Sequence, residues 1–232
     1  MAVPPALLPY RRTAWLPVTD DADGPRDASK LAGTAWTSDD APWPTCPNCG
    51  RPLQLLLQLD PADLPDGAPE VGAEGGLLQL FYCTSQDPLC EVDREAFLPF
   101  SDSVVARRVV PDGEPAAPPA LAAPFPPRQI VGWEPLDDLP TPEDAPDAAL
   151  TEAEWDEVYA AGHVERDKLG GWPLWIQGPE RPDCPRCGRT MEVVFQLVSE
   201  DQLPIVFGDM GTGHLTQCPE HRDVLAFGWA CT

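Results

Sequence analysis

Short apolar runs bounded by turn-forming residues dominate the hydrophobic pattern of the chain. The run Leu53 to Leu59 is too short and too uniformly apolar for an amphipathic helix, so it predicts a buried strand. Asp60 to Gly76 is rich in Asp, Pro and Gly and is expected to form a solvated loop, after which Gly76 to Cys83 predicts the returning strand. A further strand is expected over Ser103 to Val110.

The second half of the chain shows one helical pattern followed by more strands. Thr151 to Ala161 carries apolar residues on one face, begins with a capping-box pattern and is followed by Gly162 as a stop. We expect a helix there that packs on the body of the protein. Strands are then predicted at Met191 to Val198, in the segment that ends at Cys218, and at Val224 to Cys231.

Two stretches of the chain are copies of each other. CPNCGRPLQLLLQL (Cys46 to Leu59) and CPRCGRTMEVVFQL (Cys184 to Leu197) are identical at seven of fourteen positions, and the same offset aligns Lys30 with Lys168 without a gap. We therefore predict an α+β, β-dominated fold with two tandem structural repeats of antiparallel strands, each with a Cys-x-x-Cys zinc knuckle, and few short helices. The expected organisation is an extended N-terminal lead-in (1–29), a first repeat (30–110), a Pro/Ala-rich acidic connector (111–150) and a second repeat (151–232).

Composition narrows the classes of partner. The 31 prolines and 18 glycines favour short strands and irregular loops. The net charge of -23 argues against nucleic acid, whose binding depends on Lys and Arg. The acidic surface either serves solubility, which is the simpler interpretation, or attracts a basic protein partner at long range. No stretch is long and apolar enough to span a bilayer, and the N-terminal sequence MAVPPALLPYRR lacks an apolar signal core, so a cytoplasmic location is expected.

Cysteine spacing indicates metal sites. In a reducing compartment, eight cysteines that include two Cys-x-x-Cys knuckles are better explained by zinc than by disulfides. Each returning strand should run antiparallel to the strand that leaves its knuckle, which brings further ligands back to the knuckle. We predict two structural zinc ions, one bound by Cys46, Cys49, Cys83 and Cys90, and the other by Cys184, Cys187, Cys218 and His221.

The fourth ligand of the second site has a rival in Cys231. A strand from Val224 would carry Cys231 roughly 20 Å from the knuckle, so His221 is preferred and Cys231 is expected to be a buried free thiol. The alternative for either group is a set of reduced, inert thiols. Four protein ligands leave no coordination position for an activated water, so both sites are interpreted as scaffolding.

Other motifs favour structural roles. KLGGWPLWIQG (Lys168 to Gly178) could present two tryptophans as a binding platform, but core anchoring fits large aromatic residues better. GDMGTGH (Gly208 to His214) lacks the Lys-Ser/Thr of a phosphate loop and predicts a hairpin turn. No catalytic or cofactor-binding residue is predicted.

The combination of KLGGWPLWIQG, CPRCGRTMEVVFQL, GDMG and FGWAC resembles the YwqG-like family, a bacterial family of largely uncharacterised function. KLAGTAW and GLLQLFYC in the first half match as well, so the resemblance extends over nearly the whole chain from Trp15. A more remote similarity is to the programmed-cell-death-2 proteins, which are chaperones for a basic ribosomal protein. The resemblance implies a duplicated, β-dominated fold and a non-enzymatic role. Ala32 and Ala35 depart from the second copy, which has Gly170 and Pro173.

Three functions follow as hypotheses. The first is a non-enzymatic, zinc-stabilised protein-binding module that acts as a chaperone or adaptor for a basic partner. The second is an immunity-type protein that neutralises a toxin, because YwqG-like proteins are associated with toxin systems. The third is a metal-dependent hydrolase or nucleic-acid-processing enzyme, which the absence of a catalytic constellation and the sign of the charge disfavour.

Overall fold

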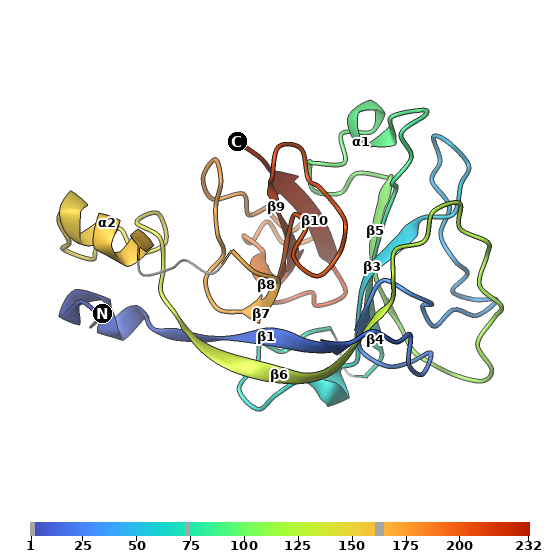
Figure 1. The fold of residues 1–232 in the computed structure, drawn as a ribbon, viewed down its shortest axis with the longest axis horizontal. Helices are drawn as coiled ribbons and strands as arrows, with labels where there is room; N and C mark the ends of the chain where they lie inside the picture. The colour runs from blue at the N-terminus through green and yellow to red at the C-terminus, as the bar shows by residue number, and fades with distance from the viewer. Residues whose placement is uncertain (1–2, 73–74, 161–164) are drawn as a thin grey trace.

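The computed structural model of the chain describes residues 3–72, 75–160 and 165–232, and in them ten strands form one antiparallel sheet (Figure 1). The strands are β1 (Arg12–Asp20), β2 (Lys30–Leu31), β3 (Gln54–Leu59), β4 (Leu77–Tyr82), β5 (Val104–Val109), β6 (Arg128–Asp138), β7 (Lys168–Gly170), β8 (Glu192–Val198), β9 (Thr212–Gln217) and β10 (Leu225–Ala230). Their order is β10-β9-β8-β7-β1-β6-β2-β3-β4-β5. The β-dominated class is thus confirmed.

The described helices are few and short. They are α1 (Cys90–Asp93), α2 (Glu152–Ala160) and two 3-10 turns, Pro5–Tyr10 and Pro61–Asp63. At the start of α2 the Glu154 carboxylate accepts hydrogen bonds from both the backbone and the hydroxyl of Thr151, as the capping-box pattern predicts. Val158 is buried while Tyr159 is 43% exposed, so only part of the expected apolar face packs. Gly162, the predicted stop, lies outside the described residues.

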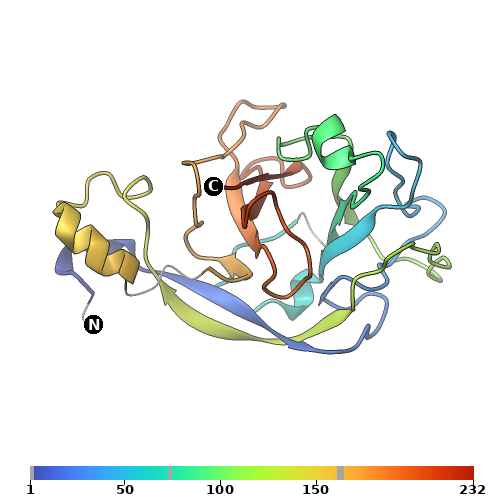
Figure 2. The same cartoon turned by 45° about the horizontal axis from the view of Figure 1, so that its top comes forward.

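The long strands β1 and β6 pair at the centre of the sheet and join its two halves. They run side by side along the base of the molecule, with β7 to β10 on one side and β2 to β5 on the other (Figures 1 and 2). β1 pairs with β7, whereas β6 pairs with β2. The expected lead-in therefore contains a central strand of the sheet, which sequence analysis did not assign because Pro17 interrupts its pattern. The expected connector, residues 111–150, likewise contains the central strand β6.

The two halves of the sheet share their strand register. Lys30 pairs with Gln58 across β2 and β3, and Lys168 pairs with Gln196 across β7 and β8. The bulge in β3 lies between residues 55 and 57, and that in β8 lies between residues 193 and 195. Both features recur at the offset that relates the two copies in the sequence.

One hydrophobic core links the halves. It contains buried residues of β3 and β4 together with those of β8, β9 and β10. Trp229 donates an indole hydrogen bond of 3.0 Å to the hydroxyl of Tyr82, and the Tyr82 ring makes edge contacts with Phe207 and Phe227. The end strands β5 and β10 approach each other, so the sheet curls into a near-barrel. The two sets of strands are therefore parts of one folded body.

The segment 60–76 differs from its predicted role as a solvated loop. The backbone N–H of Gly72 donates to Gln217 Oε1 at 2.6 Å, and Gln217 Nε2 donates to the carbonyl of Glu70 at 2.9 Å. Val71 is buried against the shared core. The loop crosses onto β9 because its polar backbone groups find partners there, a long-range contact that local composition does not encode.

Candidate metal centres

The first group of predicted ligands comes together beneath α1. The ligand atoms of Cys46, Cys49, Cys83 and Cys90 all lie within 4.8 Å of one another, and the Sγ atoms of Cys49 and Cys83 are 3.7 Å apart. Cys46 and Cys49 come from the knuckle before β3, Cys83 follows the end of β4, and Cys90 begins α1. The antiparallel return of β4 thus delivers the second pair of cysteines.

The second group has the same construction with a histidine in the fourth position. Cys184, Cys187, Cys218 and His221 place their ligand atoms within 4.8 Å of one another. The Sγ atoms of Cys187 and Cys218 are 3.6 Å apart, and His221 Nδ1 lies 3.8 Å from both Cys184 Sγ and Cys218 Sγ. β9 returns antiparallel to β8 and brings Cys218 to the knuckle.

Each knuckle is closed by the same backbone hydrogen bonds. Gly50 donates its N–H to the carbonyl of Cys46, and Gly188 donates to that of Cys184, each at 2.8 Å. Both glycines have positive φ angles, 68° and 69°, in a region where a side chain is disfavoured. The turn directs the two sulfurs of each Cys-x-x-Cys to one side.

Hydrogen bonds to sulfur orient the remaining ligands. Asn48 Nδ2 donates to Cys90 Sγ at 3.3 Å, and the backbone N–H of His221 donates to Cys218 Sγ at 3.2 Å. Such bonds favour the thiolate over the thiol and fix the direction of its lone pairs.

Each group contains a thiol whose pKa is well below the ordinary value. Desolvation opposes ionisation of Cys49, but the backbone N–H of Arg51 and the neighbouring thiols lower the pKa of Cys49 to about 7. Desolvation likewise opposes ionisation of Cys218, whereas backbone hydrogen bonds from His221 and Glu220 lower its pKa to about 6. Burial raises the pKa of Cys83, so that thiol needs a cation beside it to ionise.

The donor atoms fit a tetrahedral zinc ion. With zinc–sulfur bonds of about 2.3 Å, the sulfur atoms of a tetrahedral site lie about 3.8 Å apart, close to the distances found here. The cysteines are free thiols, and the shortest of these separations is well beyond the ~2.05 Å of a disulfide bond. Both groups could hold zinc with four protein ligands each.

Cys231 lies outside both groups. It follows β10, its carbonyl accepts a hydrogen bond from Gln177, and its side chain packs near Gly208. The thiol is half-buried rather than buried as expected, because the strand ends before it and leaves it at the margin of the core.

The chain matches a family described as a domain of unknown function, DUF1963, over residues 29–220. The chain belongs to the DUF1963 family. No curated protein matches the sequence. The DUF1963 region contains all seven cysteines of the two ligand groups and ends immediately before His221, and it excludes β1 and β10.

The other motifs of this DUF1963 protein have structural roles in the fold. Trp172 and Trp175 are buried, and their indole N–H groups donate to Tyr10 O and Asp144 Oδ2, each at 2.7 Å. Residues 208–210 form a turn that leads into β9. His214 is buried in β9 with its ring centroid 4.6 Å from that of Trp175, and desolvation lowers its pKa to about 3. No helix in the described part of the chain is long and apolar enough to cross a membrane.

A cleft beside Trp172 was not predicted from the sequence. It has a volume of about 790 Å³ and is lined by Arg12, Trp15, Arg181 and residues of the 66–69 loop, among others. Arg12 lies in the segment expected to be a lead-in, and residue spacing gives no sign that it meets Trp172. Only the pairing of β1 with β7 brings the two together.

Proposed function

We propose that this protein is a non-enzymatic, zinc-stabilised protein-binding module, a chaperone or adaptor, for a basic partner in the cytoplasm. The observation that carries the proposal is the surface of residues 89–100, which we call the docking segment. Its second residue, Cys90, belongs to the first candidate metal group, and the segment exposes apolar and acidic side chains together. The proposal also places one zinc ion in each group.

A bound zinc ion would hold the first residues of the docking segment in place. Cys90 is both the fourth ligand of the first group and the first residue of α1, so a bound ion holds the docking segment to β4 and the knuckle. Structural zinc contributes on the order of 10 kcal/mol to folding, as much as a typical domain's net stability. With all four positions taken by protein atoms, the ion serves as a scaffold rather than as a Lewis acid.

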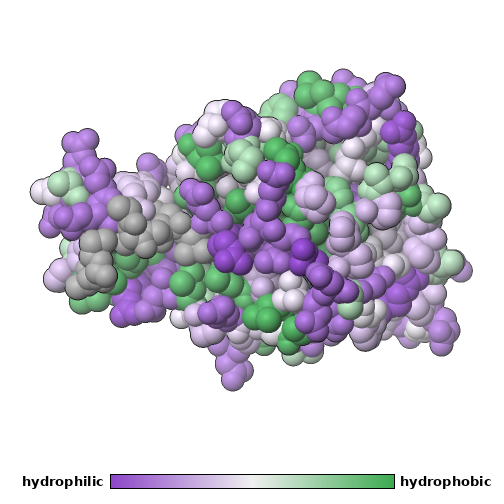
Figure 3. All heavy atoms as spheres, viewed as in Figure 1, coloured by the Kyte–Doolittle hydropathy of each residue, from purple (hydrophilic) through white to green (hydrophobic). Residues whose placement is uncertain are grey.

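The docking segment exposes several large apolar side chains to solvent. Val92 is 58% exposed, Leu98 47% and Phe100 49%. Apolar residues gather over α1 beside hydrophilic ones at the top of the surface view (Figure 3). Several large apolar side chains exposed within one short segment are typical of a protein interface.

The far end of the segment is anchored on the other half of the sheet. The backbone N–H of Trp229 donates to the carbonyl of Phe97 at 3.1 Å, and the two rings meet edge to face with centroids 5.8 Å apart. The segment is thus fixed at both ends while its apolar side chains remain accessible, which lowers the entropy lost on binding.

Charge favours a basic partner. Glu91, Asp93 and Glu95 lie in the segment, whose basic residue Arg94 is already paired with Asp102. The whole chain carries a net charge of -23. Acidic groups around an apolar patch attract Lys and Arg at long range and suppress neutral or acidic competitors.

Site-specific photo-cross-linking tests the proposal. A benzophenone side chain at Leu98 of the zinc-loaded protein is exposed to the soluble proteins of its source cells, with Val131 of β6 as the control position. Val131 is 51% exposed, comparable to Leu98, but lies outside the docking segment. We expect Lys/Arg-rich proteins to attach at Leu98 and not at Val131, and to be lost at about 0.5 M salt, where surface charges are screened.

The Glu95→Lys variant then separates recognition from chance contact. The variant should bind the protein identified by cross-linking more weakly once that protein is purified, and its binding should depend less on salt concentration. Its zinc content should be unchanged. The same conjugates at both positions, or no conjugates at Leu98, would contradict the proposal. A single secreted toxin as the conjugate would favour the immunity function instead.

We further propose that the chain is an internal duplication of the YwqG-like type. Lys30 Nζ donates to Asp23 at 3.0 Å, and Lys168 Nζ donates to Asp138 at 2.7 Å. In both halves the same carboxylate oxygen also accepts the backbone N–H of the residue four positions after the lysine, at 2.8 and 2.7 Å. Burying a charged lysine costs free energy unless a carboxylate pairs with it. The same buried lysine–carboxylate pair at equivalent positions of the two copies supports an origin of both copies from one unit.

A further inference from the structure

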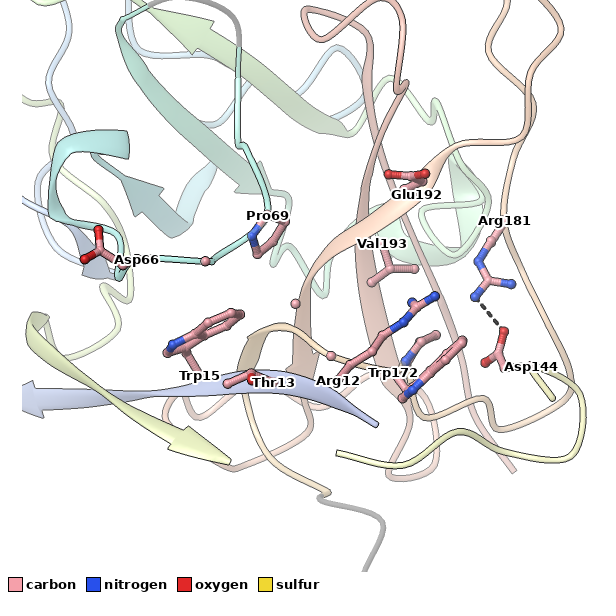
Figure 4. A pocket seen from close by; sticks show the side chains of 14 residues that line it. Arg12, Thr13, Trp15, Asp66, Pro69, Asp144, Trp172, Arg181, Glu192 and Val193 are labelled. Carbon is pink, nitrogen blue, oxygen red and sulfur yellow. Dashed lines mark hydrogen bonds and ion pairs between the residues drawn. The ribbon is translucent and has the colours of Figure 1, made fainter. Parts of the chain in front are cut away.

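The cleft beside Trp172, which we call the Arg12 cleft, is a second surface separate from the docking segment. It lies between β1, the end of β7, the start of β8 and the loop that contains Asp66 and Pro69 (Figure 4). Its volume of about 790 Å³ falls within the range of sites that hold small molecules or a few peptide residues. The cleft therefore has room for a ligand.

One end of the cleft presents a guanidinium group that no carboxylate of the described residues pairs with. The Arg12 guanidinium lies 3.4 Å above the ring centroid of Trp172, which fixes its plane, and Figure 4 shows it pointing into the cleft. Among the described residues it makes no hydrogen bond or ion pair. A guanidinium stacked in this way presents its N–H groups edge-on, in the geometry that binds a carboxylate by two parallel hydrogen bonds.

The neighbouring arginine is already occupied. Arg181 donates to Asp144 at 2.6 Å and stacks 4.8 Å from the Trp175 centroid, and Asp144 also accepts the Trp175 indole N–H. The Asp144 side chain is only 3% exposed, so both of its oxygens are used within the protein. Arg12 is thus left as the cation available to a ligand at this end of the cleft.

The other end of the cleft combines apolar surface with one carboxylate, Asp66. Trp15 and Pro69 line it, and Gly170 and Gly171 contribute no side chains. Asp66 marks the far end from Arg12, and Glu192 lies above the arginine in Figure 4. A ligand with a flat apolar group can contact Trp15 while its anionic group meets Arg12.

The corresponding place in the first half of the sheet lacks these features. Thr34 stands where the second copy has Trp172 and offers no aromatic face. Because β6 pairs with β2 as β1 pairs with β7, Phe125 takes the place of Arg12, and its ring packs against the core. The Arg12 cleft is therefore a feature of the second half alone and not a by-product of the repeated strand pattern.

We propose that the Arg12 cleft binds a peptide segment through a carboxylate, with an adjacent proline or aromatic residue packed against Trp15 and Pro69. A carboxylate fits better than a phosphate because Glu192 and Asp66 repel a dianion more strongly than a monoanion. The carboxylate belongs either to a chain terminus or to an acidic side chain, and matched peptides distinguish these sources.

The test follows the indole signals of Trp15 and Trp172 by NMR in the full-length, zinc-loaded protein. The probes are N-acetyl-Pro-Pro-Phe with a free terminal carboxylate, the same peptide as an amide, N-acetyl-Pro-Asp-Phe as an amide, and inorganic phosphate. We expect at least one carboxylate peptide to shift both signals and to bind about tenfold or more tightly than the Pro-Pro-Phe amide.

Arg12→Gln should reduce the affinity of the carboxylate peptide to that of the amide. Arg11→Gln is the matched control, since Arg11 is the adjacent arginine but pairs with Asp137 and does not line the cleft. Unchanged signals elsewhere in the spectrum verify that both variants fold. Binding to the free terminus alone identifies a C-terminal ligand, and binding to the aspartate peptide identifies an internal acidic one. Equal binding of carboxylate and amide, binding that survives Arg12→Gln, a response to phosphate alone or no response would each overturn the proposal.

Discussion

Asp167, at the start of the second half, is buried with a carboxylate that is only partly hydrogen-bonded. Its Oδ1 accepts the backbone N–H of Val198 at 2.7 Å, while its Oδ2 has no partner among the described residues. Desolvation raises the pKa of Asp167 to about 8, and the nearby charge of Asp201 acts in the same direction. The folded protein therefore holds a proton that the unfolded chain loses near pH 4.

Asp167→Asn is expected to stabilise the protein increasingly as pH rises. Between about pH 4 and pH 8, Asp167 is ionised in the unfolded wild type and protonated in the folded form. The free energy of unfolding of the wild type therefore falls by up to about 1.4 kcal/mol for each pH unit in this range. Asparagine keeps the acceptor for Val198 and cannot ionise. Urea unfolding at pH 5 and pH 8 measures the difference, which should be larger at pH 8. Equal differences at the two values would show that Asp167 is ionised in the folded state.

Cys90 and Cys231 provide a matched pair for metal content. Cys90→Ser removes a predicted ligand of the first group, so the purified variant should retain one zinc ion per chain instead of two. Cys231→Ser should retain two, because Cys231 lies outside both groups. Elemental analysis by mass spectrometry measures both. Loss of zinc from the Cys231 variant alone would contradict the assignment of ligands.

Among the elements of the sheet, the contact of β7 with β1 depends on Gly171. Gly188 has nearly the same φ angle and serves as a comparison. Gly171 has φ +70°, and a Cβ built there would lie 2.6 Å from the Cβ of Ala14 and 2.4 Å from Asp138 Oδ2. Gly188, in the second knuckle, has φ +69° with nothing within 4 Å. The first position is constrained by both angle and space, the second by angle alone.

Alanine at these positions should therefore have unequal effects. Gly188→Ala is expected to cost about 1 kcal/mol for the positive φ. Gly171→Ala adds a clash with β1 and with the carboxylate that holds Lys168, which raises the cost by about 1–3 kcal/mol more. Thermal or urea unfolding of both variants gives the comparison. Similar losses would show that the β1–β7 contact is easily displaced.

At the scale of the whole molecule, the sheet topology makes the two halves mutually dependent. β7 takes its second neighbour from β1, at the other end of the chain, and the core residues of β9 and β10 pack on those of β3 and β4. Within the described residues no boundary separates the predicted repeats into independent sheets. One cooperative unfolding transition is expected for the zinc-loaded protein.

A fragment of residues 151–232 should therefore fail to fold even with zinc. It contains the second ligand group but lacks β1, so the short strand β7 loses a partner and the core loses one face. Circular dichroism and hydrogen exchange with and without zinc provide the measurement, with the full-length chain as control. A zinc-dependent, protected fold in the fragment would show that the second repeat is an autonomous domain.

The β-dominated class, most strands and the two groups of candidate metal ligands were predictable from the sequence. Each of these depends on local patterns, namely apolar runs, turn residues and Cys-x-x-Cys spacing, and on an antiparallel return that pairs Cys83 or Cys218 with its knuckle. The internal copy strengthened those inferences because a second example of each pattern was available in the same chain.

The way in which these parts combine depends on contacts between distant segments of the chain. The central position of β1 and the contact of Arg12 with Trp172 depend on segments that lie far apart in the chain, which no local pattern encodes. The hydrogen bonds of Glu70 and Gly72 with Gln217 are of the same kind. Local patterns thus specify the strands and the two candidate metal groups, whereas long-range packing specifies the single core and the surfaces proposed for binding.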